Sequence, residues 1–437
     1  MFKDHYENDL TTGSDKARDH YDQGVASFLA ATYDASRHFA NSIEADPGFA
    51  LGHVGLARAQ MMAGDMASAK TSIAAAKSHI DGATARERAH LNTFDLLFQG
   101  NPAGCRAAVK AHVLDHPRDA MVAQLCTSVF GLIGFSGEVG READLLAFTT
   151  ALVPYYGEDW WMMGIHAVSL CETGRLDDAQ ALMERSLALN SRNANAAHFK
   201  GHTLYEMGEA EAGLAYLKDW IKGYDNRGLL HGHLSWHIAL HSLLVGDIDD
   251  MWALVDTGVG PGGSQGLPLN TLTDTAAILH RAELVGVAVP PERWVEMSDY
   301  AAQYFPETGQ SFADMHAALA HAMAGNGDRL AYIVDTANGF AGDLVRPVAQ
   351  AWGAIARQDW QGAVDHLIPA LAQTERFGGS RAQRDLIELT YVNALMKLGR
   401  TQEAQHTLDL RRPVLASHPG FKNGICMSVD LTTLKGE

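Results

Sequence analysis

The stretch of sequence that decides the fold is Gly174-Arg-Leu-Asp-Asp-Ala-Gln-Ala-Leu-Met-Glu-Arg-Ser-Leu-Ala-Leu-Asn190. Its first glycine is followed five residues later by the small residue Ala179, and apolar residues then recur at three- and four-residue spacing. That spacing is typical of an amphipathic helix. The same pair returns 34 residues on as Gly208 and Gly213, which indicates a helical repeat rather than an isolated helix.

A period of 34 residues is that of tetratricopeptide repeats, in which a turn joins two helices. The glycine signal also occurs at Gly64 and Gly399, whereas another copy keeps the small residue Ala363 but has Gln358 in the glycine's place. One helix pair cannot bury its apolar face alone and must stack on its neighbours. We therefore predict an all-α fold, a right-handed superhelical solenoid of ten or eleven tetratricopeptide-like helix pairs.

Expected helix ends and loops along the chain agree with this architecture. Asp46-Pro47 and His116-Pro117 are expected to end helices. The glycine-rich stretch 258–266 follows no predicted strand and lacks a GKS or GKT ending, so we interpret it as a loop between repeats and not as a phosphate cradle. The predicted organisation is an N-terminal extension at residues 1–15, a single repeat domain at 16–420 and a C-terminal tail at 421–437.

Composition excludes several classes of partner. The net charge of −18 and pI near 5.5 argue against nucleic acid, whose phosphates attract clustered Lys and Arg. No run of eighteen uncharged apolar residues and no apolar segment after a basic start is present, so we predict a cytoplasmic protein without a membrane partner. The cysteines are too scattered for a CxxC motif and are predicted to be buried thiols: Cys105, Cys126, Cys171 and Cys426.

Two histidine-rich segments carry the candidate site. Helical residues four apart lie one turn above each other on the same face. In a tetratricopeptide unit the first helix lines the concave surface, and the turn at Gly208 places the preceding polar stripe on that surface. The stripes are His198, His202 and Glu206, and then His233, His237 and His241.

Three chemistries are open to these side chains. Neutral histidine beside a carboxylate can exchange protons near pH 7 without a metal. The same groups could recognise a small polar or anionic ligand. No HExxH, Cys-His cluster or GxSxG motif selects among them, so no cofactor is expected, and a divalent metal is left open. If a metal is present, the predicted ligands are His198, His202, Glu206 and His237.

Several further segments combine into a recognisable pattern: Asp46-Pro-Gly-Phe-Ala-Leu-Gly-His53, Arg86-Glu-Arg-Ala-His90, Asp115-His-Pro-Arg-Asp119, Glu172-Thr-Gly, His233-Leu-Ser-Trp-His237, Asp314-Met-His316 and Gly378-Gly-Ser-Arg-Ala-Gln-Arg-Asp385. Together with the helix of the first stripe, they resemble the tetratricopeptide repeat protein 38 family from about residue 18 to about residue 415. The family supplies no established reaction. The resemblance implies ligand-binding positions at His53, His90, Glu172, His233, Trp236, Asp314, His316, Arg384 and Asp385.

Some of these positions also have structural interpretations. His231 and His241 depart from the family pattern and are weaker candidates. Asp314 and His316 are two residues apart on a helix, so at most one of them is expected to contact a ligand. His53 is either a groove residue or a histidine satisfied by a backbone hydrogen bond.

The main prediction is a concave pocket for a small polar metabolite with hydrolase or lyase chemistry. His202 and His237 would be acid and base, Glu206 would orient one imidazole, and Arg384 would hold an anionic group. The alternative is a scaffold that binds a peptide segment of a partner protein. A closed cavity beside the histidines would favour the enzyme and an open channel the scaffold, while substrate, metal and a homodimer are left open.

Overall fold

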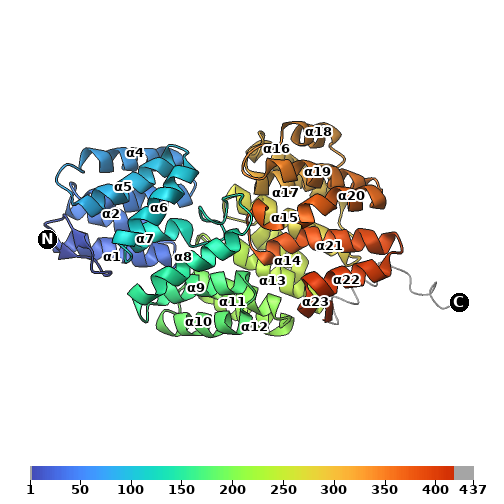
Figure 1. Cartoon of the computed structure of the whole chain (residues 1–437), viewed down its shortest axis with the longest axis horizontal. Coiled ribbons are helices and arrows are strands. Elements are labelled where there is room, and N and C mark those ends of the chain that lie inside the picture. Colours follow the sequence, from blue (N-terminus) through green and yellow to red (C-terminus); the bar gives the residue numbers. More distant parts are fainter. Residues whose placement is uncertain (1, 418–437) are drawn as a thin grey trace. The chain divides into compact units, whose positions relative to one another are not determined.

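The computed structural model describes residues 2–417, and its backbone divides into two compact units (Figure 1). The division runs inside one continuous helix, α11 (Ala194–Glu206), between Lys200 and Gly201. The predicted tail at 421–437 and Cys426 lie outside the described residues. Of the described residues, the first unit holds 2–136, 142–200 and 223–230, and the second holds 137–141, 201–222 and 231–417.

The first unit consists of successive helix pairs. Helix α1 packs on α2, α3 on α4, α5 on α6 and α9 on α10, and the first helices of neighbouring pairs also touch. A small antiparallel ladder of two-residue strands precedes them, too short to show an alternating sequence pattern. The elements are β1 (Phe2–Lys3), β2 (Asp9–Leu10), α1 (Asp15–Leu29), α2 (Ala35–Ala45), α3 (Ala50–Met62), α4 (Met66–Ser78), α5 (Ala85–Phe98), α6 (Pro102–Asp115), α7 (Ala120–Ala123), η1 (Gln124–Cys126), α8 (Arg141–Tyr156), α9 (Trp160–Glu172) and α10 (Leu176–Leu189).

Phe39 shows how one helix of a pair reaches the next pair. Its fully buried ring lies against Gly24 of α1 and Gly55 of α3, and a Cβ atom at either glycine would collide with it. Tyr21 packs on the same ring with centroids 5.9 Å apart. Glycine at these helix positions costs helix propensity, but it lets an aromatic side chain fill the space between three helices.

The second unit continues the pairing with α13 on α14, α15 on α16, α17 on α18, α19 on α20 and α21 on α22. Helix α15 packs on its neighbours α13 and α17. It also contacts α21, which lies much later in the sequence. The elements are α12 (Ala210–Trp220), η2 (Ile221–Gly223), α13 (His231–Val245), α14 (Ile248–Leu254), η3 (Val255–Val259), α15 (Pro268–Leu284), α16 (Pro291–Tyr304), α17 (Ser311–Met323), α18 (Gly327–Thr336), α19 (Gly342–Ala356), α20 (Trp360–Leu371), η4 (Thr374–Phe377), α21 (Arg381–Lys397), α22 (Thr401–Arg411) and α23 (Pro413–Ser417).

The turns confirm the repeat signals. Gly64, Gly174, Gly208 and Gly399 all have φ between 75° and 81°, the left-handed region that glycine enters without steric cost. Gln358, at the position where the glycine is missing, is forced to φ 59°. The predicted all-α, tetratricopeptide-like fold is therefore confirmed.

Predictions about helix ends and about the burial of cysteines are also confirmed. Helix α2 ends at Ala45, before Asp46-Pro47, and α6 ends at Asp115, before His116-Pro117. Gly258 and Val259 of the glycine-rich stretch end the π-helical turn η3, and the rest of the stretch lies in the loop before α15. Within residues 2–417 no helix is both long and apolar enough to span a membrane. Three cysteines are buried, and no disulfide joins them to other described residues: Cys105, Cys126 and Cys171.

Candidate functional site

Four buried histidines from two helices lie close together. His198 and His202 lie one turn apart on α11, and His233 and His237 lie one turn apart on α13. One ring nitrogen from each lies within 4.8 Å of those of the other three. Three of the four belong to the second unit, and His198 precedes His202 on the same continuous helix. Two histidines of each sequence stripe therefore lie close together.

The rings pack directly on one another. The centroids of His202 and His237 are 4.3 Å apart, and those of His233 and His237 are 4.9 Å apart. The indole of Trp236 stacks on His233 with an interplanar angle of 9° and a centroid distance of 5.3 Å. Each of the four histidines is at most 3% exposed. The predicted acid and base, His202 and His237, are thus in mutual contact in a buried environment.

A carboxylate that sequence reasoning missed supports this group. Nδ1 of His233 donates to Oδ2 of Asp274 on α15 across 2.6 Å, and Asp274 is 2% exposed. This bond fixes the tautomer and the orientation of the His233 ring. The available signal was Asp274 as the single charged residue of segment 267–279.

Burial favours the neutral form of His202. It lowers the pKa of His202 well below its ordinary value, and the neighbouring His233 and His241 lower that pKa further. Burial also lowers the pKa of His241 to about 4. His241 lies apart from the four and packs on Gly213 of α12, where a Cβ atom would overlap its ring. Gly213, the second glycine of the Gly208/Gly213 repeat signal, therefore leaves room for the His241 ring.

Glu206 does not join the histidines as predicted. Arg412 donates through Nη1 to Oε1 and Oε2 of Glu206 at 2.9 and 3.1 Å, and Arg381 lies 3.2 Å from Oε2. The predicted metal set changes accordingly, because the fourth member of the clustered group is His233 and not Glu206. The reason is geometric, since Glu206 lies at the end of α11, within reach of the arginines of α21 and the residue after α22.

Asp385 and Arg384 lie in a second buried network. Asp385 accepts from Arg281 at 2.5 Å and from the hydroxyl of Tyr205 at 2.6 Å. Arg384 donates through Nε to the carbonyl of Ser380 at 3.3 Å within its own first turn. Both side chains are at most 4% exposed, and the contacts of Asp385 join α21 to α15 and α11.

Asp314 and His316 point to separate partners, as their spacing requires. Asp314 accepts from the backbone N–H of Gly309 at 2.9 Å, while His316 donates through Nδ1 to the carbonyl of Phe312 at 2.7 Å. Burial raises the pKa of Asp314 to about 6 and lowers the pKa of His316 to about 4.

The remaining predicted residues belong to the first unit. His90 bonds through Nδ1 to Oδ2 of Asp119 at 3.0 Å, and His112 and Arg86 converge on the same oxygen at 3.0 and 2.7 Å. Although desolvation opposes it, electrostatic attraction from His90 and Arg86 and hydrogen bonds from both histidines hold the pKa of the buried Asp119 well below its usual range. The other two predicted residues are Glu172, buried at the end of α9, and His53, which bonds to the carbonyl of Pro47 at 3.0 Å.

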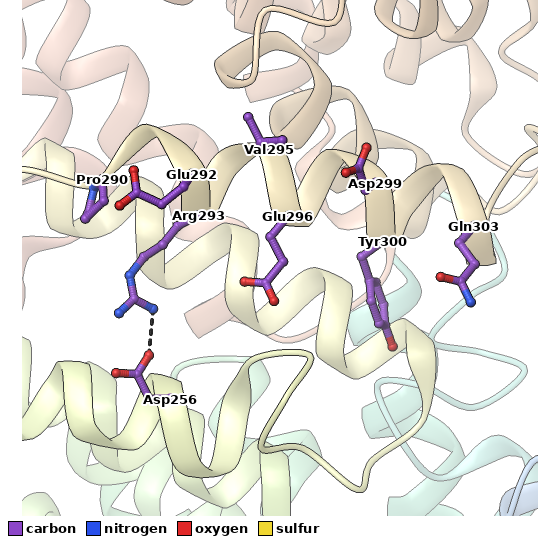
Figure 2. A pocket seen from close by; sticks show the side chains of 9 residues that line it. All are labelled: Asp256, Pro290, Glu292, Arg293, Val295, Glu296, Asp299, Tyr300 and Gln303. Atoms are coloured by element: carbon purple, nitrogen blue, oxygen red, sulfur yellow. Dashed lines mark hydrogen bonds and ion pairs between the residues drawn. The ribbon is translucent and has the colours of Figure 1, made fainter.

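An open groove in the second unit was not anticipated from the sequence. It has a volume of about 820 Å³ and runs along α16 beside η3. Figure 2 shows Arg293, Glu296 and Tyr300 extending from α16 toward the segment that carries Asp256, and Arg293 lies 2.7 Å from Asp256. The full lining is Asp256, Pro290, Glu292, Arg293, Val295, Glu296, Asp299, Tyr300 and Gln303.

Comparisons with known proteins assign no family to this chain. No family model matches the chain, so the resemblance to the tetratricopeptide repeat protein 38 family stays a prediction. A human IFIT1 dimer with m7Gppp-AAAA is 13% identical with a TM-score of 0.45, over 96% of this chain and 92% of that chain. Yeast Tom70 is 11% identical with a TM-score of 0.36, over 95% and 88%. At these values neither structure assigns an activity or a partner to this protein.

Proposed function

We propose that this protein is a tetratricopeptide-like scaffold that binds a basic, extended segment of a partner protein in the groove along α16. The observation that carries this proposal is the open groove itself, which is lined by four carboxylates and one guanidinium. That guanidinium, Arg293, already pairs with Asp256 and lies 4.5 Å from the ring centre of Trp252. The remaining carboxylates therefore give the groove a negative field.

The carboxylates follow the helix period. Glu292, Glu296 and Asp299 lie four and three residues apart on α16, which places them on one face of that helix. Like charges one turn apart destabilise a helix slightly, and Lys or Arg side chains of a ligand would relieve that repulsion. Val295 and Tyr300 add apolar surface beside the charges. A segment with alternating basic and apolar residues fits this lining.

The predicted metabolite enzyme has less support. Its acid and base would need to contact a shared ligand, whereas His202 and His237 contact each other and are buried. Its anion-binding and orienting groups, Arg384 and Glu206, lie in buried contacts with other helices or with their own helix. The scaffold interpretation uses groups that are open to a partner.

The experiment is selection of peptides from a random displayed library on the immobilised full chain, followed by fluorescence anisotropy of the enriched sequences. We expect enrichment of Lys- and Arg-rich peptides that carry apolar residues. The triple variant Glu292→Gln/Glu296→Gln/Asp299→Asn should weaken their binding roughly tenfold, because several surface charge pairs of modest energy are lost together.

The matched control removes the same charge from α12 and its flanks in the variant Glu209→Gln/Glu211→Gln/Asp219→Asn, whose side chains are exposed. This control should bind the selected peptides as the wild type does. Equal weakening by both triple variants would mean diffuse attraction to an acidic protein and would contradict a groove-specific site. Enrichment of peptides without basic residues would contradict it as well.

A further inference from the structure

The geometry points to a buried site for a divalent transition-metal ion, which we propose is bound by the imidazoles of His198, His202, His233 and His237. This inference is independent of the peptide groove, because the histidines lie on α11 and α13 and the groove lies along α16 and η3. It also revises the metal set expected from the sequence by replacing Glu206 with His233.

Two helices supply two ligands each at the spacing that metal sites use. A pair of histidines four residues apart on one helix can hold one ion, and two facing pairs complete four-coordination. The four candidate nitrogens already lie within 4.8 Å of one another. Tetrahedral zinc with Zn–N bonds of about 2.0–2.1 Å would set them about 3.3 Å apart. Side-chain rotations that close the widest pair by about 1.5 Å would therefore suffice.

The contact between His233 and Asp274 has the form of a carboxylate–histidine–metal triad. Because Nδ1 of His233 donates to Asp274 at 2.6 Å, Nε2 is the nitrogen of this ring that would coordinate a metal. The other carboxylate oxygen, Oδ1 of Asp274, is buried and accepts no hydrogen bond from the described residues. A buried carboxylate is costly without nearby positive charge, and a dication on His233 would provide that charge.

The donor set selects the class of ion. All four ligands are imidazoles, which suit Zn²⁺, Cu²⁺, Ni²⁺ and Co²⁺, whereas Ca²⁺ and Mg²⁺ require oxygen ligands. With four protein ligands in a buried position, the site has the closed coordination of structural zinc centres, which have no open position for a substrate. Its role is therefore structural: the ion would hold α11 against α13, and Asp274 would orient the His233 ring.

The test begins with the full-length protein, produced with a tag that contains no histidines, from medium supplemented with zinc. Elemental analysis should find about one Zn²⁺ per chain. After chelation, Co²⁺ should restore stoichiometric binding and give the visible absorption bands of tetrahedral nitrogen coordination. Absence of stoichiometric metal from the purified protein, together with no Zn²⁺ or Co²⁺ uptake by the chelated protein, would overturn the proposal.

Variants then locate the ion. The double variant His202→Gln/His237→Gln should lose stoichiometric binding, while His321→Gln, which changes a buried histidine bonded to Ser298 at 2.8 Å, should keep it. Asp274→Asn should keep the Co²⁺ spectrum but weaken Zn²⁺ affinity about 10- to 100-fold in a chelator competition. Full binding by the double variant would place the ion elsewhere and refute the site. If that variant does not fold, the wild-type Co²⁺ spectrum and the Asp274→Asn affinity still decide the question.

Discussion

At the scale of single residues, several side chains that resemble catalytic groups are explained by burial and local partners. Asp314 is an example, because its carboxylate is nearly inaccessible and its described hydrogen bond comes from one backbone N–H group. Burial raises its pKa from 3.8 to about 6. The folded protein therefore binds a proton at Asp314 more tightly than the unfolded chain does.

The sign of the resulting pH dependence follows from linkage. Between pH 3.8 and about 6 the folded state holds the Asp314 proton that the unfolded state has lost, so stability falls as pH rises through this window. We predict that Asp314→Asn stabilises the protein at pH 7.5 by roughly 1–2 kcal/mol, after a discount for solvent screening, and has little effect near pH 4.

Urea denaturation at both pH values measures this difference. The exposed control Asp335→Asn on the neighbouring helix α18 should leave the unfolding midpoint unchanged at each pH. Destabilisation by Asp314→Asn at pH 7.5 would show that the carboxylate is stabilised in its charged form, contrary to the proposed cause.

At the scale of elements, charged side chains hold the last helices of the second unit to its first ones. Arg412, which follows α22, donates to Glu206 at the end of α11 and through Nε to Glu388 of α21 at 2.6 Å. All three side chains are less than 10% exposed. In a buried network of this kind, removing one charged partner is strongly destabilising because the other charge stays buried without compensation. Replacing the whole pair by apolar residues changes the stability much less.

We predict that Arg412→Met destabilises the second unit by about 3 kcal/mol, because Glu206 and Glu388 remain buried with less positive charge around them. The triple variant Arg412→Met/Glu206→Gln/Glu388→Gln should recover at least half of that loss. Thermal and urea unfolding of the single and triple variants measures both values. A triple variant less stable than Arg412→Met would mean that the carboxylates stabilise the unit without Arg412.

At the scale of the whole molecule, the dominant property is the net charge of −18 at pH 7. Like charges distributed over a compact surface repel one another and destabilise the folded state, and salt screens that repulsion. The same charge favours basic partners over acidic ones. Both consequences depend on pH, because the charge approaches zero near the pI of about 5.5.

We therefore predict that the melting temperature at pH 7.5 rises by several degrees between about 20 and 300 mM NaCl, the range in which the Debye length falls below 10 Å. The rise should be much smaller at pH 5.5. Differential scanning calorimetry in matched buffers tests this expectation. Equal salt effects at the two pH values would point to a contribution other than net charge.

The sequence by itself determined the helical repeat, because the glycine at each turn and the small residue five positions later act through local conformation and close packing. It also indicated that His198, His202, His233 and His237 belong together, since a spacing of four residues places side chains on one face of any helix. Only the tertiary structure decided which partners these residues have. Asp274 reaches His233 from 41 positions away, and Glu206 meets Arg412 across 206 positions. Contacts over such distances depend on how helices stack, and local sequence patterns do not record that stacking. For the same reason the sequence pattern placed Arg384 and Asp385 among the ligand-binding residues of the concave pocket, whereas α21 packs against α15 and both side chains are buried.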